Sequence, residues 1–191
     1  GHVTGVQTCA LPILLVWLKP HLSPLFSWAA VTAAGTVCRL PDTVILTLQY
    51  IANEFKRETF LVSACRPQHF RGDRFRTDAK CTTEFVVLAG WEIGTKRWFS
   101  IKLGPTEVPY LFKPGIGAQW ASTSAELLAS WLALHMFGWL GETRERKALE
   151  IFLVGGTDNK ANESLTSKRS TTRWPLMGIN MQLSSALSDR K

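Results

Sequence analysis

Hydrophobic and polar positions divide the chain into a helical first part and a second part that is rich in strands. After Pro41-Asp42, apolar residues recur at spacings of three and four as far as Phe55, which predicts a helix with one apolar face. Proline in the first turn and aspartate at the positive end of the dipole favour a helix start at this point. A shorter helix is expected over residues 29–34, so that residues 15 to about 58 form a helical segment.

Alternating patterns then predict strands. The candidate strands cover residues 74–80, 85–93 and 97–103, and the last of them alternates between apolar and polar positions. Residues 94–96 (Gly-Thr-Lys) join the last two strands as a hairpin. These three segments are therefore expected to pair as antiparallel strands.

The remaining elements are mostly helical. The clearest helix of the chain covers residues 125–140, and a continuous apolar strand over residues 149–154 follows it. Residues 155–159 are expected to turn out of that strand into a polar helix over residues 160–168, and Pro175 starts a last helix. The order of strands and helices predicts an α/β fold with a mixed sheet and flanking helices.

Composition and charge narrow the class of protein. Hydrophobic residues make up 46% of the chain and charged residues 19%, which is typical of a globular protein. The net charge of +7 fits a polyanionic partner such as nucleic acid. No apolar run approaches the roughly 20 residues that span a bilayer, so no membrane partner is expected.

The cysteines indicate a reducing compartment. Apart from Cys9 there are three of them, Cys38, Cys65 and Cys81, at wide spacings and without a C-x-x-C pair. Neither a disulfide framework nor a zinc site is supported. A nuclear or cytoplasmic protein that is not secreted is therefore expected.

The first residues are expected to have an origin different from that of the rest of the chain. Residues 3–13 resemble the frame translation of a common short-read sequencing adapter over eleven consecutive positions. Residues 1–13 are therefore interpreted as an adapter-derived artefact and are excluded from the fold. The genuine chain is expected to begin in mid-protein, near residue 14.

Three acidic residues at the ends of predicted elements form the candidate site. Asp78 lies in a short strand, Glu126 in the first turn of the helix over residues 125–140, and Asp158 directly after the strand over residues 149–154. In the fold that this order suggests, the three positions could converge at the centre of the sheet. Converging carboxylates repel, and a hard divalent cation with oxygen ligands relieves the repulsion. Two such ions can stabilise the attacking water and the leaving oxygen in phosphodiester cleavage.

The segments around these acids resemble the motifs of retroelement ribonuclease H domains. The matching segments are Arg76-Thr77-Asp78-Ala79, Gly90-Trp91-Glu92-Ile93, residues 122–129 (Ser-Thr-Ser-Ala-Glu-Leu-Leu-Ala) and Thr157-Asp158-Asn159. The later segment Thr172-Arg173-Trp174-Pro175-Leu176 is similar to a stretch that recurs in reverse transcriptase-like open reading frames. The resemblance implies a ribonuclease H-like domain over residues 71–191 that is truncated at its C-terminus. It also implies that residues 14–70 are a helical segment, similar to the thumb or connection of a reverse transcriptase, with a basic linker.

The resemblance implies a metal-dependent endonuclease that hydrolyses the RNA strand of RNA–DNA hybrids within a reverse transcriptase-like retroelement polyprotein. Asp78, Glu126 and Asp158 would be its catalytic groups and its Mg²⁺ or Mn²⁺ ligands. Basic side chains would contact phosphates and position the strand without determining its sequence. These are Arg74, Arg76, Lys160, Lys168, Arg169 and Arg173.

The chain departs from the family pattern at one point. The family has a fourth acid in an Ala-Asp dipeptide after a further strand, and this chain has no match to it, since Asp189 follows a helix. Whether the fragment turns over substrate with three of the four acids is therefore open. The alternative function is a non-catalytic, degenerate module that binds nucleic acid or connects parts of the polyprotein.

Each acid also has a structural interpretation. Thr123 and Glu126 have the spacing of a capping box, and Asp158 could cap the helix that follows it. Asp78 could be a turn former at a strand end. Most of the eight tryptophans occupy apolar positions, where core packing is expected, and Trp120 and Trp174 are the better candidates for stacking on a base.

Overall fold

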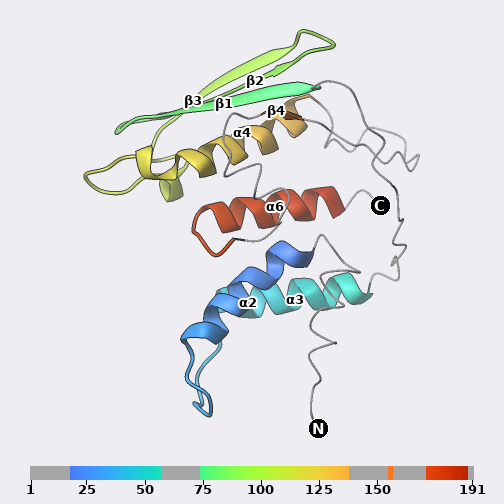
Figure 1. Ribbon diagram of the computed structural model, residues 1–191, viewed down its shortest axis with the longest axis vertical. Coiled ribbons are helices and arrows are strands. Elements are labelled where there is room, and N and C mark those ends of the chain that lie inside the picture. Colours follow the sequence, from blue (N-terminus) through green and yellow to red (C-terminus); the bar gives the residue numbers. More distant parts are fainter. Residues whose placement is uncertain (1–17, 57–73, 138–154, 157–170, 189–191) are drawn as a thin grey trace.

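A mixed four-stranded sheet forms one layer of the fold (Figure 1). The structure is a computed structural model, which describes residues 18–56, 74–137, 155–156 and 171–188. The strand order is β3-β2-β1-β4; the first three strands are antiparallel neighbours and β4 is parallel to β1. The strands are β1 (Phe75–Cys81), β2 (Val86–Glu92), β3 (Trp98–Leu103) and β4 (Gly155–Gly156).

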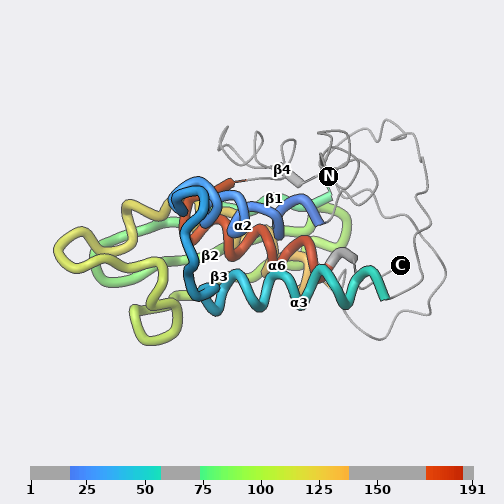
Figure 2. Tube along the Cα trace, turned by 90° about the horizontal axis from the view of Figure 1, so that it is seen from below, coloured from blue at the N-terminus to red at the C-terminus, as the bar shows by residue number. Residues whose placement is uncertain are grey.

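In the part of the chain that the structure describes, four helices lie on one side of this sheet in successive layers. Helix α4 packs directly on β1 and β2, α6 packs on α4, and α2 with α3 forms the outermost layer (Figure 1). Seen from below, α2, α6 and α3 lie side by side in front of the sheet (Figure 2). The helices are α2 (Lys19–Val31), α3 (Asp42–Lys56), α4 (Ser122–Met136) and α6 (Leu176–Ser188).

The core lies between α4 and the sheet. Ala125, Ala129 and Ala133 are fully buried and recur every four residues, so α4 presents a row of small side chains to the strands. This row lets the helix approach the strands closely, and larger buried residues such as Leu88 and Phe99 fill the layer around it. Burial of these side chains is the main stabilising contribution to the pairing of helix and sheet.

A buried histidine joins the outer helices to α6. The Nε2 atom of His21 lies 3.0 Å from the Oγ atom of Ser185, and its ring stacks on Tyr50 at 4.2 Å between centroids. These contacts connect α2 to both α3 and α6. Helix α6 therefore contacts α2 of the first segment as well as α4.

The structure confirms the predicted strands and the hairpin. The three antiparallel strands start and end within a few residues of the predicted bounds, and the Glu92 N–H donates to the Arg97 carbonyl at 2.8 Å across the hairpin. The apolar sides of α6 and of the third strand face the core as predicted, with Ile179 and Phe99 buried. A mixed α/β fold is therefore confirmed.

The first helices differ in detail from the prediction. Of the predicted short helix over residues 29–34, residues 29–31 are helical and form the end of the longer helix α2, while residues 32–34 lie beyond it. Helix α2 contains Pro20 in its first turn and Pro24 inside it. Helix α3 starts at Asp42 as predicted. Its predicted apolar face is buried at Val44, whereas Phe55 stays 43% exposed because this outermost helix has a packing partner on one side.

The N-terminal cap of α4 differs from the prediction. The helix begins at Ser122, its N-cap is Ala121 and no side chain makes a cap hydrogen bond. Thr123 and Glu126 both lie inside the helix, so the capping box is wrong, and so is the placement of Glu126 in the first turn. The reason is a 3-10 turn over Gln119–Ala121, which leads directly into the helix.

The end of the chain is described in part. Gly155 and Gly156 pair with β1 as strand β4, where the pattern predicted that they turn away from a strand. The predicted strand over residues 149–154, the polar helix over residues 160–168, residues 1–13 and most of the basic linker lie outside the described residues. Among the helices that are described, none has the length and hydropathy needed to cross a membrane.

Candidate functional site

Asp78 lies in the middle of β1 and points away from the helices. Burial alternates along this strand, so that Phe75 and Thr77 are buried while Arg76 and Asp78 are exposed. The Oδ1 atom of Asp78 accepts a hydrogen bond of 2.8 Å from the backbone N–H of Ala79. Its exposed carboxylate lies on the face of the sheet opposite α4, next to Ala89 of β2.

Glu126 lies on α4 above the end of the same strand. The hydroxyl groups of Thr77 and Ser130 lie 2.9 Å apart, which fixes α4 over β1, and Glu126 is one helical turn before Ser130. Burial raises the pKa of the Cys81 thiol, and the negative charge of nearby Glu126 raises it further. Glu126 is therefore near the part of β1 that follows Asp78.

The two acids approach β1 from opposite sides. Thr77 faces α4, so Asp78, its neighbour in the strand, faces the other way, and an ion shared with Glu126 could lie only at the edge of the strand. In the described residues, pairing with β4 covers this edge as far as Arg76. Past the last residue that pairs with β4, the strand edge is where both carboxylates could reach one ion.

The third acid, Asp158, lies outside the described residues. The residues that are described contain no group of three His, Cys, Asp or Glu side chains that could hold a metal ion. Asp78 and Glu126 supply carboxylate oxygens, which hard divalent cations such as Mg²⁺ prefer. The chemistry of these two donors fits such an ion, and the donor set needs a third ligand from elsewhere in the chain.

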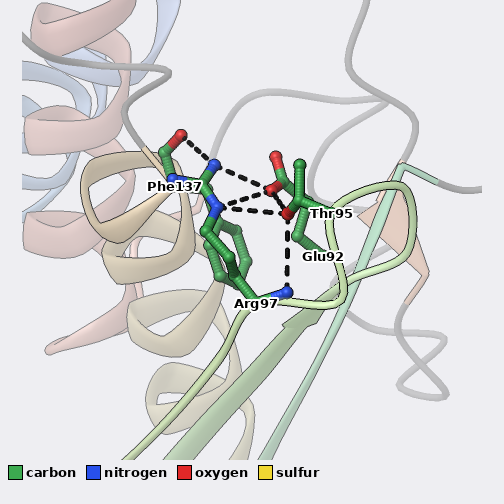
Figure 3. Close-up of polar contacts among 4 residues, drawn as sticks. All are labelled: Glu92, Thr95, Arg97 and Phe137. Carbon is green, nitrogen blue, oxygen red and sulfur yellow. Dashed lines mark hydrogen bonds and ion pairs between the residues drawn. The ribbon is translucent and has the colours of Figure 1, made fainter.

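An ion pair holds the β2–β3 turn against the end of α4 (Figure 3). The carboxylate of Glu92 is buried, and its Oε2 atom accepts hydrogen bonds from Thr95 and, at 2.9 Å, from the Nε atom of Arg97. The Nη2 atom of Arg97 lies 2.7 Å from the same oxygen and also donates to the carbonyl of Phe137 at 2.8 Å. The pair therefore serves structure, because it ties the hairpin to the C-terminal end of α4.

The predicted phosphate contacts lie partly in the described residues. Arg74 and Arg76 are exposed on the side of β1 that carries Asp78, and Arg173 is exposed before α6. Lys160, Lys168 and Arg169 lie outside the described residues. Of the two tryptophans expected to stack on bases, Trp120 is half-buried beneath the ammonium group of Lys113, 3.8 Å from its ring centroid, while Trp174 is 58% exposed.

The sequence analysis missed an aromatic and basic surface on the sheet. Trp91 and Trp98 face each other across β2 and β3 and are 50% and 75% exposed, although core packing was expected for them. Lys80 and Lys102 are exposed on the same face. The alternation of the third strand, which places Trp98 with polar residues, was the available signal.

Comparisons with protein-family models, with curated proteins and with solved structures found no match to this chain. The functional argument therefore rests on the residues themselves and on the arrangement of the sheet.

Proposed function

We propose that residues 71–191 form a ribonuclease H-like, metal-dependent endonuclease that hydrolyses the RNA strand of RNA–DNA hybrids, as part of a reverse transcriptase-like retroelement protein. Asp78, Glu126 and Asp158 would hold Mg²⁺ or Mn²⁺. Divalent ions at such a site supply charge stabilisation and an activated water for phosphodiester hydrolysis. The exposed cations beside Asp78 would hold the phosphates.

The parallel pairing of β4 with β1 is the observation that carries this proposal. Gly155 pairs with Phe75 and Gly156 with Arg76, and Asp158 has the same offset from Asp78 in the sequence. If the pairing continues for two residues, the two aspartates are neighbours on one face, because partners in a parallel pair project to the same side. The proposal requires this continuation.

The position of Glu126 supports the same site. Glu126 is close enough to the end of β1 for its charge to raise the pKa of the Cys81 thiol. Ala79, the residue after Asp78, has a small side chain. A carboxylate from α4 could therefore reach past the strand edge toward the side of Asp78. The fourth acid of the family has no counterpart in this chain, so a cleavage assay decides whether the three acids support turnover.

Cleavage of a hybrid with a labelled RNA strand tests the proposal. We expect cleavage with Mg²⁺ or Mn²⁺, none in excess chelator, and losses of at least about 100-fold in Asp78→Asn, Glu126→Gln and Asp158→Asn, which is the scale of removing a group that acts in the transition state. Glu84→Gln, an exposed acid in the β1–β2 turn, is the matched control and should keep full activity. Equal activity in all four variants, or cleavage that persists in chelator, would contradict the proposal.

A second measurement separates ligation from folding. Mg²⁺ should raise the melting temperature of the wild-type chain, and Glu126→Gln should abolish this increase while it leaves the metal-free melting temperature near normal. The same loss of stability with and without metal would assign Glu126 a structural role.

The alternative is a non-catalytic module that binds nucleic acid by charge. The exposed cations Arg74, Arg76 and Arg173 favour it, because they are accessible whether or not a metal is bound. Hybrid binding that persists in excess chelator, together with the absence of cleavage in every metal tested, would select this function.

A further inference from the structure

The face of the sheet opposite the helices carries a regular arrangement of side chains. The helices of the described residues all lie on the other side (Figure 1), so the alternate residues of β1, β2 and β3 on this face are accessible. The pairing register aligns them in rows that run across the strands. Because these rows come from the backbone register, their spacing is fixed by the sheet itself.

One row, which we call the tryptophan row, consists of Arg76, Trp91 and Trp98, each directly opposite the next. Side chains opposite each other in antiparallel strands have Cβ atoms about 5 Å apart, so the two indoles are neighbours. Trp98 is 75% exposed and Trp91 50%. Two large aromatic side chains are thus accessible beside a guanidinium group.

A second row, which we call the lysine row, consists of Lys80, Val87 and Lys102 in the same register. The Nζ atom of Lys102 lies 4.0 Å from the centroid of the Phe85 ring, which holds this cation on the face. The two rows are four residues apart along each strand, about 13 Å. Between them lie the small residues Ala89 and Ser100 and the carboxylate of Asp78.

We propose that this face binds a single-stranded nucleic acid, with bases stacked on the tryptophan row and phosphates at the lysine row. Exposed aromatic rings combined with cations are the elements by which proteins bind single strands without sequence preference. Stacking on a tryptophan requires an unpaired base, which a duplex or a hybrid does not offer. The inference goes beyond hybrid cleavage and does not depend on metal binding.

The charges of this face favour nucleic acid over a protein partner. Among the described residues of this face, Arg74, Arg76, Lys80 and Lys102 outnumber the acid Asp78. A second copy of the chain in a two-fold arrangement would place like charges against each other. An apolar helix would remove these cations from water and offer them no negative charge, which is costly. A polyanion gains from the same charges, because it releases its own counterions on binding.

Fluorescence anisotropy with a labelled oligothymidylate strand tests the inference, with the full chain in excess chelator so that metal-dependent cleavage plays no part. Trp98→Leu keeps an apolar side chain but removes the aromatic ring, and it should weaken binding about 5- to 150-fold, which is the range of one stacked base. Phe26→Leu, at an exposed aromatic residue of α2 on the other side of the sheet, is the matched control and should change the affinity less than two-fold.

The charged positions give a second readout. Lys80→Gln and Lys102→Gln should each reduce the slope of log affinity against log salt by about 0.7, the value for one phosphate contact on a single strand. Lys56→Gln, at an exposed lysine at the end of α3, should leave the slope unchanged. Asp78→Asn removes a negative charge from the face and should tighten binding in chelator, whereas it abolishes activity if the nuclease proposal holds.

Three results would overturn the inference. The first is equal affinity of Trp98→Leu and Phe26→Leu, and the second is binding of duplex DNA as tightly as of the single strand. The third is a wild-type dimer in sedimentation velocity that Trp98→Leu converts to a monomer, which would assign the face to contact between copies. Circular dichroism melts of each variant show that the fold is retained, and Trp91→Leu repeats the stacking test at the neighbouring position.

Discussion

The ion pair between Glu92 and Arg97 gives a quantitative test of how the sheet is held to α4. We consider Arg97→Ala, which removes both contacts to the Glu92 carboxylate and the hydrogen bond to the Phe137 carbonyl. The carboxylate is 6% exposed and the arginine 50%, so the pair lies between a surface pair and a buried one. The expected loss of stability therefore lies between the values typical of an exposed pair and of a buried pair.

Exposed ion pairs contribute about 0.2–1 kcal/mol, whereas removal of one partner of a buried pair costs about 3–5 kcal/mol. Because water reaches one side of Arg97, we expect Arg97→Ala to lower the free energy of unfolding by about 2 kcal/mol. For a chain of 191 residues this corresponds to a decrease of about 4–8 °C in Tm. Glu92→Gln keeps the shape of the side chain, and we expect it to cost about 1–2 kcal/mol.

The double-mutant cycle separates the pair from its surroundings. Glu92→Gln with Arg97→Ala should cost about 1–2 kcal/mol less than the sum of the single changes, as measured by urea unfolding followed by circular dichroism. Glu84→Gln, an exposed glutamate in the preceding turn, is the control and should stay within about 0.5 kcal/mol of the wild type. Costs that add to within about 0.3–0.5 kcal/mol would refute the coupling and with it the role of this pair as a tie to α4.

Two further predictions concern the loop before α4 and the thiol beside Glu126. Gly117→Ala should cost about 3 kcal/mol or more, because the residue has φ +70° and a Cβ atom there would lie 2.2 Å from the Cα atom of Thr83. Gly115→Ala, with φ +77° and open space, should cost about 1–2 kcal/mol, and equal losses in urea unfolding would contradict the close approach. In a variant whose other cysteines are replaced so that only Cys81 remains, the alkylation rate should reach its maximum at a higher pH than for an ordinary thiol. Glu126→Gln should lower the pKa of this thiol and move the profile of alkylation rate against pH to lower pH. The folded state holds the thiol proton more tightly than the unfolded state. The contribution of Cys81 to stability is therefore present at lower pH and is lost as the pH rises through the pKa of the thiol in the folded state. An alkylation profile that stays unchanged in Glu126→Gln would place Glu126 away from Cys81.

Local pattern was sufficient where neighbouring residues in the chain decide the structure. The alternation of the third strand correctly placed Phe99 in the core, and the Gly94-Thr95-Lys96 sequence correctly predicted a hairpin. In the structure of this hairpin, Lys96 has a positive φ. The start of α3 at Asp42 was also predicted, since proline and aspartate act within one helical turn. Short-range sterics and hydrogen bonding determine each of these features.

The start of α4 shows where local pattern misleads. Thr123 and Glu126 have the spacing of a capping box, but the preceding 3-10 turn already directs the backbone into a helix at Ser122. The turn is held by contacts outside the segment, such as the hydrogen bond from the Ala118 N–H to the Thr82 carbonyl. The helix therefore starts where the tertiary structure positions the chain.

The sequence by itself determined the types of element, the mixed α/β class and the acids of the candidate site. The tertiary structure decided which strand lies beside β1 and on which side of the sheet the helices pack. Because the helices cover one face of the sheet, Trp91 and Trp98 on the other face are exposed although they are apolar. For the same reason, Asp78 and Glu126 approach β1 from opposite sides. Alternation defines two faces of a strand, but only long-range packing decides which of them meets water.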